Sequence, residues 1–133
     1  MPANSLMNRL ANATNPYQGP YKRALCVCSA GLLRSPTAAW VLAQEPYNFN
    51  TRAAGLTKEF ALVPVDEVLL HWADEVICMD EEQAEGIRFM LNDLGEDKPV
   101  VVLRVPDHYG YRDPDLVEEI KAAYNTHLNA REP

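Results

Sequence analysis

The sequence predicts a single α/β domain with a three-layer α/β/α arrangement, in which a four-stranded parallel sheet lies between two layers of helices. Short apolar, β-branched segments alternate along the chain with longer segments whose apolar residues recur at helical spacing. Prolines and glycines separate these segments. Strands that alternate with helices are joined by crossovers, which makes the strands parallel and covers both faces of the sheet. The predicted strands are 22–27, 49–54, 75–79 and 100–105.

The first strand and the helix after it have clear local signals. Residues 22–27 are almost continuously apolar, as a strand covered on both faces should be. After a short loop, Ser35 is expected at the N-cap of a helix and Pro36 at its first position, where the missing N–H costs nothing. This helix is expected to reach Glu45, with Pro46 as its stop.

The middle of the chain contains a weaker strand and a second helix. Residues 49–54 predict the strand, which Gly55 ends, and residues 64–72 predict the helix, in which His71 is expected on the surface. The residues expected to face the core from this helix are Val65, Val68, Leu69 and Trp72.

The second half repeats the alternation of strand and helix. After the strand 75–79, Asp80 is expected to cap a helix with Gln83 as its capping-box partner, and Gly95 is expected to end that helix. The apolar positions of this helix are Ala84, Ile87, Met90, Leu91 and Leu94. After the fourth strand, Asp113 caps and Pro114 opens a final helix. Its apolar face consists of Leu116, Val117, Ile120, Tyr124 and Leu128.

Composition restricts the class of protein. The chain has 133 residues, 47% apolar and 23% charged, as in a globular domain. Residues 1–20 are rich in Asn, Ala and Pro and are expected to be a flexible N-terminal extension, which leaves 21–133 as the domain. The formal net charge of −7 argues against nucleic-acid and anionic-membrane binding. No segment has the length of a membrane span or the apolar core of a signal peptide, so a cytoplasmic protein is predicted.

The three cysteines are expected to be free thiols. The Cα atoms of Cys26 and Cys28 would lie about 6.6 Å apart on a strand, near the limit for a disulfide. Cys26 is therefore expected to pack in the core, although a protective redox role stays open. A Cys-x-Cys pair without further Cys or His neighbours is poor support for zinc, and no metal or cofactor is predicted.

The loop between the first strand and the first helix is the strongest candidate site. It lies over a helix N-terminus, where unpaired amides and the helix dipole favour an anion. Cys28 begins the loop and Arg34 closes it, and Gly31 permits the positive φ that an inward-curling backbone needs. The residues expected to surround a bound phosphate are Ser29, Ala30, Gly31, Leu32, Leu33, Arg34 and Ser35.

This arrangement suits phosphoryl transfer to sulfur. Helix N-termini and nearby cations stabilise thiolates, and the Ser35 hydroxyl can add a hydrogen bond to the sulfur of Cys28. The Arg34 guanidinium presents a rigid fork of donors for two phosphate oxygens. The alternative is a buried structural cysteine beside a surface arginine, but strand, spacing, Ser-Pro and helix together favour the phosphate site.

The chemistry also requires a general acid. When a thiolate attacks a phosphate monoester, the leaving oxygen needs a proton, and one carboxyl group can later serve as the base for water. Asp107 and Asp113 are the candidates, because both follow the fourth strand, at the sheet edge where Cys28 also lies. Asp113 is already explained as a helix cap, so Asp107 is preferred.

These residues resemble a known family. The pattern Cys-x5-Arg-Ser after the first strand, the Ile-Cys-Met-Asp segment ending at Asp80, and the Asp-x-Tyr segment 107–109 are similar to the low-molecular-weight protein tyrosine phosphatases. The resemblance covers 22 to about 128 and is nearest to a short prokaryotic or phage-type branch. It implies Cys28 as nucleophile, Arg34 as phosphate ligand and Asp107 as acid.

The resemblance also has departures. His108 replaces the proline of the family's Asp-Pro-Tyr motif, and Leu33 replaces the second loop cysteine of the eukaryotic members. Leu32, Tyr109 and Tyr111 are expected to line an apolar slot for a phenyl ring. Related arginine phosphatases carry Thr at the position of Leu32. A phosphotyrosine protein or a small aryl phosphate is therefore the expected substrate, turned over by a monomer or weak dimer.

Other functions stay open at this level. Arsenate reductases share the loop, but their redox relay resembles a cysteine pair several residues apart, and Glu85 stands seven positions after Cys78. A glutaredoxin-linked reductase is a further alternative. A non-catalytic phosphopeptide-binding module would not need both Cys28 and Asp107, and a phosphocysteine sugar-transport carrier would not need Arg34 before Ser-Pro.

Overall fold

The computed structural model describes residues 21–29, 34–57, 63–106 and 109–131. Along these residues strands and helices alternate, and the strands form one parallel sheet in the order β2-β1-β3-β4. The strands are β1 (Arg23–Cys28), β2 (Asn50–Gly55), β3 (Glu75–Cys78) and β4 (Val100–Val102). The helices are α2 (Arg34–Leu42), α3 (Glu67–Trp72), α4 (Glu81–Leu94) and α5 (Pro114–Arg131). The predicted fold class is confirmed.

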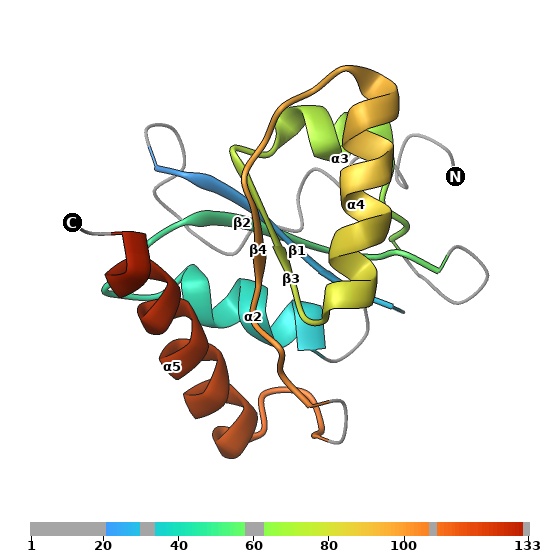
Figure 1. Ribbon diagram of the computed structural model, residues 1–133. Helices are drawn as coiled ribbons and strands as arrows, with labels where there is room; N and C mark the ends of the chain where they lie inside the picture. Colours follow the sequence, from blue (N-terminus) through green and yellow to red (C-terminus); the bar gives the residue numbers. More distant parts are fainter. Residues whose placement is uncertain (1–20, 30–33, 58–62, 107–108, 132–133) are drawn as a thin grey trace, which may run out of the picture.

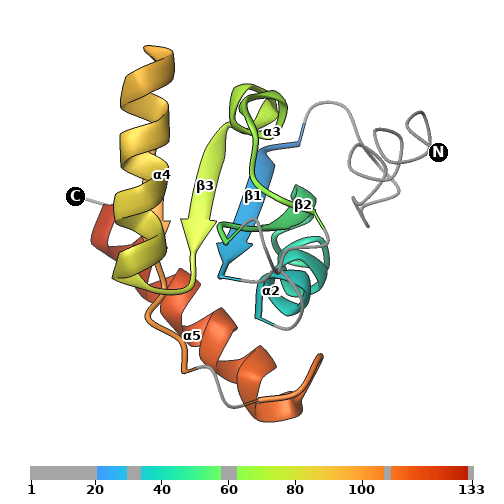
Figure 2. The same ribbon diagram turned by 90° about the vertical axis from the view of Figure 1, so that its right-hand side faces the viewer.

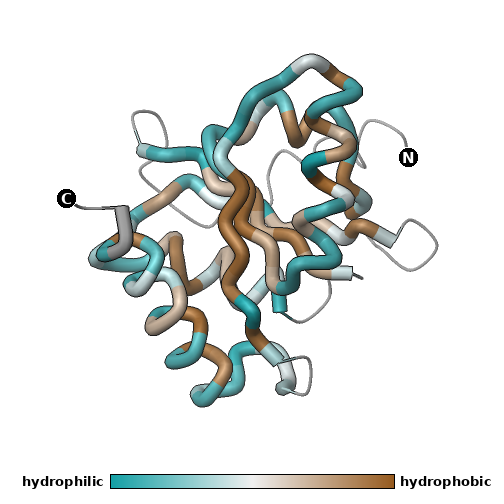
Figure 3. The backbone as a smooth tube through the Cα atoms, viewed as in Figure 1, coloured by the Kyte–Doolittle hydropathy of each residue, from teal (hydrophilic) through white to brown (hydrophobic). Residues whose placement is uncertain are grey.

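Two helical layers cover the sheet, with α2 and α5 on one face and α3 and α4 on the other (Figure 1). Alternation along β1 explains why both faces are apolar, because successive side chains of a strand point to opposite sides. Ala24 and Cys26 pack in the α2–α5 layer, whereas Leu25 and Val27 pack in the α3–α4 layer. The apolar centre of the sheet is visible as brown tube in Figure 3.

The sheet topology places Cys28 where parallel sheets bind ligands. From β1 the chain moves to β2 on one side and then crosses to β3 and β4 on the other, so the order reverses between β1 and β3. Ligands of open α/β sheets bind outside the carboxyl ends of the strands at such a reversal. Figure 2 shows β1 and β3 pointing the same way, toward the end of the sheet where α4 begins.

Helix α2 begins one residue before Ser35, so the prediction that Ser35 is the N-cap is wrong. Its hydroxyl is within 3.1 Å of Cys28 Sγ and donates to Ala54 O at 3.3 Å instead of capping the helix. Pro36 lies in the first turn, where its missing N–H is still not required. The helix ends at Leu42 and not at Glu45, because Leu42 O accepts the Phe49 N–H as the chain turns back toward β2.

Other boundaries also differ from prediction. Helix α3 is shorter than expected, since Asp66 caps it through the Leu69 N–H at 3.0 Å. Val68 was expected in the core, but it is exposed and Leu70 is buried in its place. The last strand ends at Val102 because Arg104 has a φ of 58°, which breaks the extended backbone.

The remaining helix signals are confirmed. Gln83 Oε1 accepts the Asp80 N–H at 2.8 Å, completing the capping box of α4, and Gly95 ends that helix with a φ of 70°. In α5, Asp113 Oδ1 accepts the Asp115 N–H at 2.9 Å, as expected for a cap. The buried residues of α5 are Leu116, Ile120 and Tyr124.

Candidate active site

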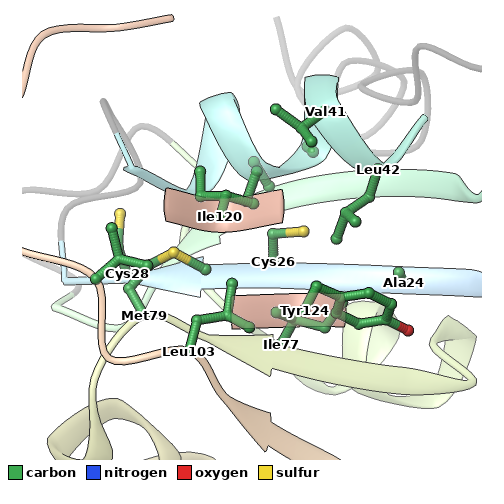
Figure 4. Packing of buried hydrophobic residues seen from close by; sticks show 14 of the residues in the cluster. Ala24, Cys26, Cys28, Val41, Leu42, Ile77, Met79, Leu103, Ile120 and Tyr124 are labelled. Atoms are coloured by element: carbon green, nitrogen blue, oxygen red, sulfur yellow. The ribbon is translucent and has the colours of Figure 1, made fainter. Parts of the chain in front are cut away.

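Cys28 ends the central strand β1, with its side chain in the α2–α5 layer and 4% exposed. Figure 4 places it at the end of the core next to Met79, with Cys26 deeper among apolar residues. Its Sγ lies 3.1 Å from the Oγ of Ser35, which is fully buried in the first turn of α2. The sequence prediction that these two groups meet is confirmed, and a buried hydroxyl is thereby held against the sulfur at a helix N-terminus.

Arg34 lies at the beginning of α2 with a side chain only 4% exposed. Its Nη1 donates to Asp80 Oδ2 at 2.7 Å and to the Val105 carbonyl at 3.0 Å. Asp80 begins α4 and Val105 follows β4, so two other crossovers orient this guanidinium. A buried arginine held in this way is pre-oriented for planar, bidentate recognition of an oxyanion.

Gln83 is a site residue that the sequence suggested only as a helix cap. It is 2% exposed, and its two amide atoms serve different partners. Oε1 accepts from Asp80 N at 2.8 Å, while Nε2 donates to Ser29 Oγ at 3.2 Å. The amide therefore connects the N-terminus of α4 to the first loop residue after Cys28. Its place directly after the carboxyl end of β3 is the signal that could have revealed it.

The backbone beside the loop is also fixed. Cys28 O accepts from Leu56 N at 2.9 Å, and Ser29 O accepts from Thr57 N at 2.8 Å, so the segment after β2 runs along the start of the loop. The predicted phosphate-binding residues Ala30, Gly31, Leu32 and Leu33 lie outside the described residues. So do Asp107 and His108. The structure describes the residues on either side of these two segments, Ser29 and Arg34 for the first and Pro106 and Tyr109 for the second.

The predicted pocket residues Tyr109 and Tyr111 have different surroundings. Tyr109 is half-buried against the α2–α5 core, and a hydrogen bond with Glu119 raises the pKa of its phenol. Tyr111 is 49% exposed. Arg112, which sequence reasoning missed, lies between the rings of Tyr111 and Trp40, with its guanidinium carbon 5.0 and 4.4 Å from their centroids.

A backbone contact places this aromatic segment beside the phosphate loop. Arg112 N donates to Thr37 Oγ1 at 2.9 Å, and Thr37 lies in the first turn of α2, two residues after Ser35. The segment that contains the two tyrosines is thus anchored at the same helix end that the loop precedes.

The other two cysteines are not suited to act as nucleophiles. Both are free and fully buried, and burial raises the pKa of Cys78 to about 12 and that of Cys26 further. Cys78 also lies in the α3–α4 layer, on the face of the sheet opposite to Cys28. The expectation that Cys26 and Cys78 are packing residues is confirmed.

Fold and geometry together define an α/β protein with a cysteine at the carboxyl end of its central strand and a buried arginine one loop later. No family profile matches the sequence, and no curated protein matches it as a relative. Solved structures do match, and their fold is that of the low-molecular-weight protein tyrosine phosphatases, as the sequence resemblance predicted.

Three of these structures illustrate the range of their activities. A low-molecular-weight protein tyrosine phosphatase from Streptococcus pyogenes is 15% identical, covers 84% of this chain and 94% of its own, and has a TM-score of 0.61. The YwlE arginine phosphatase from Geobacillus stearothermophilus is 21% identical over 86% of this chain and 99% of its own, with a TM-score of 0.56. A thioredoxin-dependent arsenate reductase from Corynebacterium glutamicum is 17% identical over 96% of this chain and 70% of its own, with a TM-score of 0.52.

No helix in the described part of the chain is long and apolar enough to cross a bilayer. Among the same residues, no three His, Cys, Asp or Glu side chains are grouped as metal ligands would be.

Proposed function

We propose that the chain is a cysteine-dependent phosphatase of the low-molecular-weight family that hydrolyses phosphotyrosine and other aryl phosphates through a phosphocysteine intermediate. The observation that carries this proposal is the contact of 3.1 Å between Cys28 Sγ and the buried Ser35 hydroxyl, next to the oriented Arg34. A packing cysteine does not need a buried hydroxyl partner at a helix N-terminus. An attacking thiolate does, because it must hold a negative charge in a site that excludes water.

In the first step, the Cys28 thiolate attacks phosphorus and the bond from phosphorus to the aryl oxygen breaks. The Arg34 guanidinium binds two of the equatorial oxygens, whose negative charge is spread in the transition state. The leaving phenolate takes a proton, which we assign to the carboxyl group of Asp107. In the second step Asp107 accepts a proton from water, the water oxygen bonds to phosphorus, and the bond from phosphorus to sulfur breaks to return the thiolate.

Chain connectivity supports Asp107 as the acid. Val105 O is bonded to Arg34 Nη1, and Asp107 follows only two residues later. Two residues span at most about 7 Å of chain, so the proposed role is compatible with the short connection from Val105 to Asp107. Asp113, the alternative, uses its carboxylate to cap α5, and that role leaves it poorly suited to exchange protons in each cycle.

The substrate assignment rests on the aromatic segment after Asp107. Arg112 is anchored on α2 beside the loop, and Tyr111 contacts it through the bond from Arg112 Nε to the tyrosine hydroxyl at 2.9 Å. Half-exposed rings beside a phosphate site offer apolar surface to the phenyl ring of an aryl phosphate. Together with Leu32 they support phosphotyrosine over phosphoarginine or arsenate. The three free cysteines suit a reducing compartment, and we propose the cytoplasm.

The experiment that tests the proposal is hydrolysis of para-nitrophenyl phosphate as a function of pH. Cys28→Ser and Arg34→Ala should abolish turnover, and Asp107→Asn should greatly lower kcat. Asp113→Asn should mainly lower stability, while Cys26→Ala, two residues from the nucleophile on the same strand, is the matched control that should keep activity. Acid quenching of Asp107→Asn during turnover should trap one phosphate on Cys28, detected by mass spectrometry.

The same experiment separates the alternative functions. Turnover that survives Cys28→Ser would contradict the proposal outright. Binding of phosphotyrosine without turnover would favour a phosphopeptide-binding module, and arsenate-dependent oxidation of an added thiol would favour a reductase. The reductase is disfavoured because Cys78 lies across the sheet from Cys28 and is protonated at neutral pH.

A further inference from the structure

An apolar groove lies between α3 and α4, in the helical layer on the other side of the sheet from Cys28. It consists of two adjoining hollows of about 450 and 390 Å³ that share Glu67 and Leu94. We call it the α3–α4 groove. Its apolar residues are Pro64, Val65, Val68, Phe89, Met90 and Leu94.

The groove contains three of the five large hydrophobic residues that are exposed in the described part of the chain. Phe89 is 74% exposed, Val68 44% and Leu94 37%, and the other large hydrophobic residues that are exposed there are Tyr21 and Tyr111. Phe89 lies on α4 with its ring outside the core, whereas the next residue of that helix, Met90, packs against the core of the α3–α4 layer. Contiguous exposed apolar surface with a polar rim is typical of an interaction site.

The rim of the groove is acidic. Four carboxylates line it, from Asp66, Glu67, Asp93 and Glu96. Glu67 and Asp93 are exposed, and no ion pair joins either of them to another described residue.

The neighbouring basic side chains, His71 and Lys98, contact Glu96 at one end of the groove. His71 Nδ1 lies 2.6 Å from Glu96 Oε1, and Lys98 Nζ lies 3.5 Å from Glu96 Oε2. Lys98 also donates to the carbonyl oxygens of His71 and Ala73, at 2.7 and 2.6 Å. The negative charge of Glu67 and Asp93 is therefore directed to solvent beside the exposed ring of Phe89.

We propose that the α3–α4 groove binds an amphipathic segment of a partner protein whose apolar side chains are flanked by lysine or arginine. An apolar strip between two helices suits the apolar face of a third helix. The part of α4 that lines the groove, from Phe89 to Leu94, extends over roughly 9 Å, which corresponds to between one and two turns of a docked helix. Cationic residues at the edges of that face would meet Glu67 and Asp93. The occupant is thus specified by shape and by charge.

A second copy of this chain fits the groove less well. Two copies that met face to face would bring their acidic rims together, and each chain carries a formal charge of −7. Juxtaposed like charges oppose such an interface. Cys28 packs in the other helical layer, so the groove and the candidate nucleophile lie on opposite faces of the sheet. The inference therefore does not depend on the proposed phosphatase activity.

The probe for the test is a labelled 18-residue helical peptide of leucine and lysine, compared with a peptide in which glutamate replaces every lysine. Fluorescence anisotropy should show binding of the leucine–lysine peptide that weakens with salt, and no binding of the leucine–glutamate peptide. Phe89→Ser should weaken binding at least about tenfold, because it removes the phenyl ring that the bound segment would bury. Amide chemical shifts should change along α3 and the second half of α4.

The acidic rim needs its own matched control. Asp93→Asn should weaken binding several-fold, whereas Glu118→Gln, which removes an equally exposed carboxylate from α5 in the other layer, should leave it unchanged. Equal effects of these two variants, or binding that tolerates Phe89→Ser, would overturn the proposal. A dimer in sedimentation that Phe89→Ser dissociates would also overturn it, in favour of a second copy as the occupant.

Discussion

The contact between Cys28 and Ser35 gives the sharpest prediction for Ser35→Ala. The single hydroxyl hydrogen of Ser35 has two acceptors within reach, Ala54 O at 3.3 Å and Cys28 Sγ at 3.1 Å. While sulfur carries its own hydrogen, Ser35 can donate to Ala54 O and accept from the thiol. When the sulfur is ionised or leaves phosphorus as a thiolate, the hydroxyl must turn toward it and release the carbonyl.

The magnitude follows from the difference between these two hydrogen bonds. A hydrogen bond to a charged group contributes about 1.5–3 kcal/mol and a neutral one about 0.5–1.5 kcal/mol. The exchange therefore stabilises the thiolate by about 1.4 kcal/mol, which corresponds to a roughly tenfold change in rate. We expect Ser35→Ala to slow both turnover of para-nitrophenyl phosphate and alkylation of Cys28 by iodoacetamide by about this factor.

Thr51→Val is the matched control for loss of a buried hydroxyl. Thr51 Oγ1 is also fully buried and donates to a backbone carbonyl, Ala39 O, at 2.8 Å, but it does not contact Cys28. Both variants should lose about 1 kcal/mol of unfolding free energy in urea titration. If Ser35→Ala lowers stability like Thr51→Val but leaves the alkylation rate unchanged, the hydroxyl does not support the thiolate and our reasoning is refuted.

Four further predictions concern other parts of the molecule. Gln83→Glu keeps an acceptor for the α4 cap but loses the donor to the loop, so kcat should fall several-fold with little loss of stability; an unchanged kcat would show that this contact is not needed. Tyr124→Phe should lower the unfolding free energy by about 1.5–3 kcal/mol without affecting turnover, because the Tyr124 hydroxyl donates at 2.8 Å to the buried carboxylate of Glu75, at the start of β3 and away from Cys28. At neutral pH iodoacetamide should add one group, on Cys28, and three groups in concentrated urea, counted by mass spectrometry. Burial raises the pKa of the Cys78 thiol to about 12, so the folded protein keeps the thiol proton at a pH at which the unfolded chain loses it. The unfolding free energy should therefore fall as pH rises above about 8.5.

Controls for these predictions come from the same chain. Tyr47→Phe removes an exposed hydrogen bond to Asn125 at 2.7 Å and should cost much less than Tyr124→Phe. Alkylation of Cys78 in the native protein at neutral pH would contradict its burial. A stability that does not change between neutral and alkaline pH would contradict the raised thiol pKa.

Features that depend on neighbours along the chain could be predicted from the amino-acid sequence. The alternation of strands and helices, the capping box of Asp80 and Gln83, and the cap at Asp113 are set by residues within four positions of one another. The place of Cys28 and Ser35 on either side of one loop is equally local. Local errors arose where a partner in another element competed, as when the Ser35 hydroxyl donates to Ala54 O in β2 instead of capping its helix.

The partners that complete the candidate site come from segments far apart in the chain. Arg34 and Asp80 are 46 residues apart, Ser29 and Gln83 are 54 apart, and Thr37 and Arg112 are 75 apart. These contacts exist because β3 lies next to β1, and strand order is set by the packing of whole apolar faces, which no local pattern encodes. The nucleophile could thus be read from the chain, whereas the groups that orient the arginine and the loop became visible only when the sheet was assembled.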